Sequence, residues 1–135
     1  MYNGNGYAEF SAFRTYDDVN IGWLVAPAFD LTTASTAYVS FKLAQHHVSD
    51  EINNPLEVFV SSDFDGSNVT AATWTKLNVA IPGQSASWYA FQESGLIDVS
   101  AYSGNLYLAF KYTGSGNNTN LDGGYFVDDV LFLKQ

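Results

Sequence analysis

The chain has 135 residues, with 5 lysines and arginines against 14 aspartates and glutamates, so its formal net charge is −9. This length suits one domain, residues 1–135, that buries about two-thirds of its unfolded surface, and the absence of cysteine excludes disulfides, thiolate zinc sites and thiol nucleophiles. The acidic surface repels phosphate backbones, and no run approaches the roughly 20 apolar residues that cross a bilayer, so we expect neither a nucleic-acid partner nor membrane insertion.

Short alternating runs separated by turn residues fill the chain, and no segment keeps a helical period for three turns. The first predicted strands are residues 7–13 and 22–27, the second ended by a proline that cannot donate to a ladder. Residues 37–44 alternate clearly, which is typical of a half-buried antiparallel strand. One face of that strand carries Val39, Phe41 and Leu43, and the other carries Tyr38, Ser40 and Lys42.

The second half of the chain continues the same pattern. Further strands are predicted at residues 56–61, 73–79, 88–92, 106–112 and 125–133. Residues 95–103 suggest an irregular connection, and Gly114–Gly124 is expected to be the longest loop. Eight or nine strands at such spacing predict an all-β fold, a two-sheet antiparallel β-sandwich of the jelly-roll type.

The order of several blocks along residues 7–133 resembles a known family. The blocks are Gly22–Leu31, Val58–Asp63, Ala72–Leu77, Trp88, Ile97–Gly104, Leu108–Tyr112 and Phe126–Val130. This series resembles the choice-of-anchor J domain, a relative of the cleaved-adhesin and MAM-like jelly rolls of Bacteroidetes-type bacteria. The resemblance implies an accessory jelly roll on secreted and surface proteins, often with bound calcium. The family's usual first strand is absent here or replaced by Met1–Gly6.

Catalytic residues are not expected in this sequence. His46 and His47 are adjacent, so on a strand they point to opposite faces and cannot converge on one metal or one proton. The chain lacks the Gly-x-Ser-x-Gly motif, and its glutamates are scattered as solvated surface charges. We therefore predict that the domain is not an enzyme.

Asp128 and Asp129 interrupt an otherwise apolar strand, and alternation places one carboxylate on each face. At least one should be half-buried and need neutralisation, for which lysine and arginine are few. Backbone N–H donors and Ca²⁺ are the two alternatives. By similarity to jelly-roll carbohydrate-binding modules, we predict a structural calcium site with Asp128 and Glu9 as ligands, pinning the last strand to the first.

Aromatic residues divide into expected core and expected surface. Trp23 lies in an apolar run, and the resemblance implies a core position for Trp74, whose block recurs in the resembling family, so both are predicted to be in the core. In the predicted strand 88–92, only one of two adjacent rings faces inward, so the other is available to stack on a sugar. The predicted ligand-binding residues are Tyr16, Trp88, Tyr89, Asn118 and Tyr125. The alternative for the loop of Asn118 is a flexible polar connection.

Two functions fit these observations. The first is a non-catalytic extracellular module, secreted or at the cell surface, that binds polysaccharide or a cell-surface glycan. The second is a protein-interaction, adhesion or spacer domain of a surface protein or lipoprotein, contacting neighbouring domains of the same chain. Residues 1–6 lack the basic and apolar regions of a secretory signal, so an exported protein would have had its signal removed.

Overall fold

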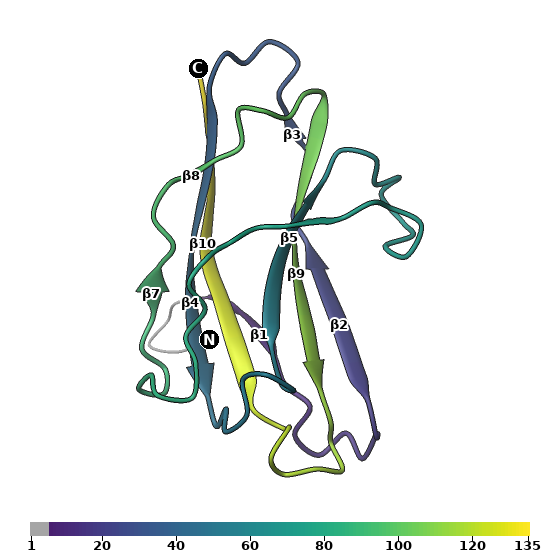
Figure 1. The fold of residues 1–135 in the computed structure, drawn as a ribbon, viewed down its shortest axis with the longest axis vertical. Helices are drawn as coiled ribbons and strands as arrows, with labels where there is room; N and C mark the ends of the chain where they lie inside the picture. Colours follow the sequence, from purple (N-terminus) through teal and green to yellow (C-terminus); the bar gives the residue numbers. More distant parts are fainter. Residues whose placement is uncertain (1–5) are drawn as a thin grey trace.

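Two antiparallel β-sheets face each other in the computed structural model, which describes residues 6–135 (Figure 1). The first sheet has the order β1–β10–β4–β7, and β8 also pairs with β4. Its strands are β1 (Ala8–Phe10), β4 (Ala37–His46), β7 (Gln92–Glu93), β8 (Ile97–Asp98) and β10 (Gly124–Lys134). The segment Met1–Gly6 stands where the resembling family has its first strand, and only Gly6 of this segment lies within the described part of the chain.

The second sheet has the order β2–β9–β5–β6, and β3 also pairs with β9. Its strands are β2 (Asn20–Val25), β3 (Phe29–Asp30), β5 (Leu56–Ser61), β6 (Thr75–Lys76) and β9 (Asn105–Gly114). The chain passes from one sheet to the other at most of its connections, as in a jelly roll. The predicted two-sheet antiparallel β-sandwich of jelly-roll type is therefore confirmed. Within residues 6–135, no helix is long and apolar enough to cross a membrane.

The core lies between the two sheets, where the inward faces of β4 and β9 meet. Val39, Phe41 and Leu43 of β4 point inward and are buried, as their alternation predicts. The Phe41 ring meets Phe110 of β9 edge to face, with ring centroids 5.0 Å apart. Each such fully buried apolar side chain contributes roughly 1.5–3 kcal/mol to folding.

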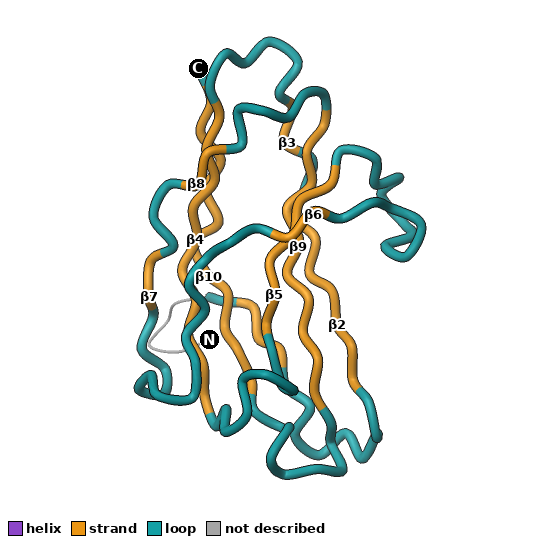
Figure 2. The backbone as a smooth tube through the Cα atoms, viewed as in Figure 1, coloured by secondary structure: helices purple, strands orange, loops and turns teal. Residues whose placement is uncertain are grey.

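Strand positions follow the sequence pattern where alternation is strong and depart from it where turns intervene. The predicted strand 56–61 has the same bounds as β5, and the predicted strand at 37–44 extends to His46. Of the predicted strand 88–92, only Gln92 lies in a strand, β7, because successive turns fold residues 83–90 (Figure 2). Gly114–Gly124 is not the longest loop, since the connections 62–74 and 77–91 are both longer.

A β-bulge in β10 overturns the expected placement of the two adjacent aspartates. Asp128 pairs with Lys42, but the next register pair is Leu131 with Ser40, so β10 carries one extra residue. Asp129 adopts the left-handed conformation there, with φ 51°. Its exposed carboxylate reaches Lys42 Nζ at 3.1 Å. Because of the bulge, the two carboxylates do not alternate between the faces of the sheet as predicted, and Asp129 finds a lysine partner.

The prediction that Trp23 and Trp74 belong to the core is wrong. Trp23 pairs in register with Lys111 and lies on the outer face of the second sheet, where both rings are half-buried. Their centroids are 5.3 Å apart, and Trp74 Nε1 donates to the carbonyl of Val69 at 2.8 Å. The long connection 62–74 covers this face and gives the two rings a small apolar cluster of their own.

Tyr125 is buried in the core, so its expected place in a surface ligand site is wrong. β10 begins at Gly124, and the register pairs Tyr125 with the inward-facing Gln45. Its hydroxyl donates to the carbonyl of Asn54 at 2.7 Å. Burial raises the pKa of this phenol. The residue therefore stabilises the fold rather than contacting a ligand.

Replacing Tyr125 with phenylalanine tests this buried hydrogen bond. We expect Tyr125→Phe to lower the free energy of unfolding by about 1–2 kcal/mol, because the Asn54 carbonyl loses its donor in a buried site. Urea unfolding followed by tryptophan fluorescence measures the change. Tyr16→Phe is the control, since that side chain is 74% exposed and should change stability by less than about 0.5 kcal/mol. Equal effects of the two substitutions would contradict the assignment.

Candidate functional site

A cavity of about 290 Å³ opens on the outer face of the first sheet, beside the end of β4. Strand β1 and the loop after it form one wall, and the end of β4 with the loops before β7 and β10 forms the rest. Its lining residues are Glu9, Ser11, Phe13, His46, His47, Tyr89 and Asp122. Titratable groups and exposed rings thus converge here from four separate segments of the chain.

Strand register brings Glu9 and His46 to the same face. Glu9 pairs with Phe126 of β10, and His46 pairs with Gly124 two residues earlier in that strand. A Cβ atom at Gly124 would collide with His46 Nε2 and with the Phe10 carbonyl. The glycine therefore leaves the space that the imidazole occupies between β4 and β1.

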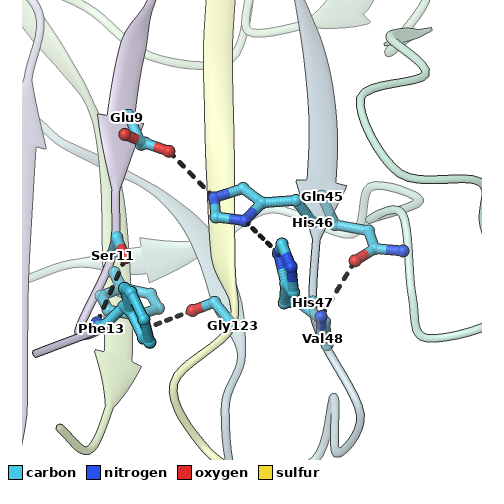
Figure 3. A network of polar contacts seen from close by, with 9 residues as sticks. Glu9, Ser11, Phe13, Gln45, His46, His47, Val48 and Gly123 are labelled. Carbon is cyan, nitrogen blue, oxygen red and sulfur yellow. Dashed lines mark hydrogen bonds and ion pairs between the residues drawn. The ribbon is translucent and has the colours of Figure 1, made fainter.

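The two histidines converge, contrary to the expectation that they point apart. His46 Nε2 lies 2.9 Å from Glu9 Oε2, and His46 Nδ1 lies 2.9 Å from His47 Nδ1 (Figure 3). β4 ends at His46, and His47 adopts φ 58°, which turns its ring back toward its neighbour. Strand alternation does not apply past the end of a strand, which is why the sequence argument failed.

The buried position of His46 determines its charge. The residue is 8% exposed, and burial is the main cause that lowers the pKa of its imidazole. The neighbouring His47 lowers this pKa as well, while Glu9 opposes both effects. His46 is therefore neutral near pH 7, and its buried Nε2 lies 2.9 Å from Glu9 Oε2.

Two exposed aromatic rings, those of Trp88 and Tyr89, contact the imidazoles of the two histidines. Trp88 and Tyr89 lie in the loop before β7 and are 52% and 54% exposed. The Tyr89 ring stacks on His46, with centroids 5.5 Å apart and planes 10° apart, and Trp88 lies 3.9 Å from His47. The Tyr89 N–H donates to the Gln45 carbonyl at 2.9 Å, which ties this loop to β4. Aromatic surface is thus fixed at the mouth of the cavity.

The other predicted ligand-binding residues lie elsewhere. Tyr16 is exposed but does not line the cavity, and neither does Asn118. Asn118 Oδ1 accepts the N–H of Asn120 at 3.0 Å, and its carbonyl accepts the N–H of Leu121 at 2.8 Å. These bonds shape the loop 115–123, and the structure does not bring Asn118 to the cavity.

Sequence reasoning missed Phe13, Asp122 and the two histidines as members of one site. Phe13 is 60% exposed and follows β1, where it stands outside the alternating pattern. In the predicted strand 7–13, Phe13 falls on the same face as Glu9 and Ser11, and a large apolar side chain on that polar face is the signal that could have marked it. Nothing local could have placed Asp122 there, because the cavity is formed by segments far apart in sequence.

The predicted calcium ligands Glu9 and Asp128 lie on the same outer face, since Glu9 pairs with Phe126 and Asp128 is two residues further along β10. Asp128 Oδ1 accepts the N–H of Asp129 at 2.8 Å, and Glu9 faces His46. Within residues 6–135, no group of three or more histidine and carboxylate side chains is arranged to hold a metal ion. The calcium site stays a prediction.

Comparison with known proteins identifies a fold but no family. No protein-family model and no curated protein matches the chain. Among solved structures, the chain is similar to TmCBM61, a carbohydrate-binding module determined in complex with beta-1,4-galactotriose, with a TM-score of 0.53. The two are 12% identical, and the match covers 98% of this chain and 74% of that one. At this identity the likeness shows the shared jelly-roll sandwich.

The lowered pKa of His46 predicts how stability depends on pH. The unfolded chain binds a proton at this imidazole near its ordinary value of 6.5, whereas the folded chain binds it only at lower pH. The stabilisation is thus complete above about pH 6.5 and is lost as pH falls through the folded pKa. We expect the free energy of unfolding to fall between pH 7.5 and 5.5, measured by urea denaturation at each pH. His46→Gln should flatten that slope, and an unchanged slope would contradict the prediction.

Proposed function

We propose that this chain is a non-catalytic carbohydrate-binding module of a secreted or cell-surface protein. The proposal rests on one observation, which is that the exposed rings of Trp88 and Tyr89 stand over His46 and His47 at the mouth of a carboxylate-lined cavity. Sugar rings have apolar C–H faces that stack on aromatic rings, and hydroxyls that bond to carboxylates and imidazoles. The site offers both kinds of group together.

The size of the cavity suits one sugar unit. Its volume of about 290 Å³ lies at the small end of ligand pockets in proteins. A saccharide would place one residue among Glu9, Asp122 and His46, and its neighbouring residue over Trp88. The fold shared with TmCBM61 supports this proposal by analogy, since the same sandwich carries a sugar site in that module.

The polar contacts support binding rather than catalysis. Both ring nitrogens of His46 already face partners, Glu9 and His47. Ser11 lines the cavity, and its Oγ accepts the N–H of Phe13 at 3.2 Å. Within residues 6–135, no serine or threonine hydroxyl is hydrogen-bonded to either histidine, as a serine–histidine nucleophile pair requires. We also keep the choice-of-anchor J family as the proposed affiliation, which agrees with an accessory role on a secreted protein.

A second candidate function, protein interaction or adhesion, is supported by a groove of about 500 Å³ on the first sheet. This groove lies farther along β4 and β10, away from the cavity. Leu96 and Leu131 line it and are 63% and 49% exposed. Lys42, Glu93 and Asp129 provide charged groups beside these apolar side chains. An apolar surface with a charged rim is typical of protein contacts. A neighbouring domain of the same chain or an adhesion partner would fit this groove.

The sugar site is tested with a matched pair of tyrosine variants. Tyr89 and Tyr16 are both exposed and both have positive φ, 62° and 63°, so their replacement by alanine has similar effects on the backbone. Against β-1,4-galactotriose and a broad glycan panel, we expect Tyr89→Ala to raise Kd at least tenfold, or about 1.4 kcal/mol. Calorimetric titration measures it, and Tyr16→Ala should leave Kd unchanged. Failure of every glycan to bind would overturn the proposal.

Calcium is tested by thermal melting of the same protein. If Ca²⁺ binds only the folded chain through Glu9 and Asp128, stability rises by about 2.7 kcal/mol at a calcium concentration one hundred times Kd. We expect a higher Tm in CaCl₂ than in EDTA, and no such difference in Asp128→Asn. Glu93→Gln is the control, because this carboxylate lies on the same face and contacts Lys42. A Tm that is equal in CaCl₂ and EDTA would contradict the predicted calcium site.

A further inference from the structure

Three polar groups form a continuous chain from β1 to the end of β4. Glu9 Oε2 faces His46 Nε2 at 2.9 Å, and His46 Nδ1 faces His47 Nδ1 at 2.9 Å (Figure 3). His46, in the middle, is 8% exposed and packs against the rings of Tyr89 and Phe126, which also contact each other. Its ring nitrogens therefore have few alternatives to these two partners.

The positions of the protons follow from counting donors. A carboxylate only accepts, so the proton between Glu9 and His46 belongs to His46 Nε2. A neutral imidazole has one N–H, so His46 Nδ1 is an acceptor and the second proton belongs to His47 Nδ1. His47 Nε2 is then left with a lone pair. The reverse order would set the lone pair of His46 Nε2 against a carboxylate oxygen at 2.9 Å, which is repulsive.

We propose that His47 Nε2 is the acceptor that recognises a hydroxyl donor of the bound saccharide, and that the site selects neutral saccharides over uronate-bearing or sulfated ones. This inference rests on the proposed function and names the substrate class of that site. Glu9 and His46 are positioning residues, because they fix the tautomer of His47 without needing to touch the ligand. Hydrogen bonding from a second group commonly sets which nitrogen of an imidazole is available.

The charges around the cavity give the selectivity. Glu9 and Asp122 both line it, and Asp122 has no hydrogen-bond or ion-pair partner within residues 6–135. None of the lining residues is a lysine or an arginine. Arg14 lies over the outer Phe13 ring, 5.0 Å from its centroid, and is not among the lining residues. Where Glu9 holds no Ca²⁺, as in EDTA, an anionic sugar would thus lose water beside two carboxylates without gaining a cation, which opposes its binding.

The tautomers can be measured without any ligand. In ¹⁵N-labelled protein at pH 8, long-range ¹H–¹⁵N spectra of the imidazoles should show His46 protonated at Nε2 and His47 at Nδ1. Glu9→Gln should disturb this order, because an amide can donate as well as accept. A merely structural role of Glu9 would leave the His47 tautomer unchanged. A His47 ring protonated at Nε2 in the unaltered protein would overturn the inference.

Recognition is then measured with neutral and anionic probes, β-1,4-galactotriose and a galacturonate trisaccharide. We expect the galacturonate to bind at least tenfold more weakly. His47→Phe keeps a ring beside Trp88 but removes the acceptor, and should raise Kd for galactotriose at least tenfold. His47→Gln restores an acceptor oxygen and should recover part of the loss. The double variant Glu9→Gln, Asp122→Asn should reduce the discrimination between the two probes.

The outcomes separate this inference from the function on which it rests. If a neutral saccharide binds, loses affinity in Tyr89→Ala and is unaffected by His47→Phe, the proposed function stands and the inference is overturned. Equal affinities for galactotriose and the galacturonate overturn it as well. If the tautomers are as expected and no saccharide binds, the hydrogen-bonded chain is established, while the proposed function and the recognition by His47 both fail.

Discussion

The pairing of β10 with β4 is the interaction on which the core and the site both depend. Its inward side chains, Tyr125 and Val127 on β10 with Leu43 on β4, fill the sandwich. Its outward positions place Phe126 beneath His46 and set Gly124 opposite that imidazole. Because successive side chains of a strand alternate between faces, one register determines both surfaces. A slip by one residue would expose the core and dismantle the cavity together.

Three of the five non-glycine residues with positive φ within residues 6–135 lie at the cavity or at the bulge of the first sheet. His47 and Tyr89, which contribute to the cavity, and Asp129, which forms the bulge, all have positive φ. Such conformations cost of order 1 kcal/mol or more and persist when surrounding contacts hold them. At His47 the contacts are the imidazole of His46 and the ring of Trp88, and at Asp129 it is the amine of Lys42. The positive φ angles therefore direct these side chains toward the cavity or toward Lys42.

The first sheet presents two surfaces of different chemistry. Near the end of β4, aromatic and acidic groups surround a small polar cavity. Further along β4 and β10, Leu96 and Leu131 line a larger groove with charged neighbours. A module that holds a glycan with one surface and packs against an adjoining domain with the other would use both. The two proposed functions are compatible on this sheet, since the residues of the two surfaces do not overlap.

Alternation and turn chemistry were sufficient to predict the sandwich, because they depend on neighbours one or two positions away. The strands at 37–46 and 56–61 show this, since their period-two patterns select a buried face without reference to the rest of the chain. Tertiary structure decided the features that a local sequence pattern does not encode. The bulge at Asp129, the turn at His47 and the burial of Tyr125 all depend on register with other strands. The cavity is likewise built by four distant segments, so its residue types were visible in the sequence while their proximity was not.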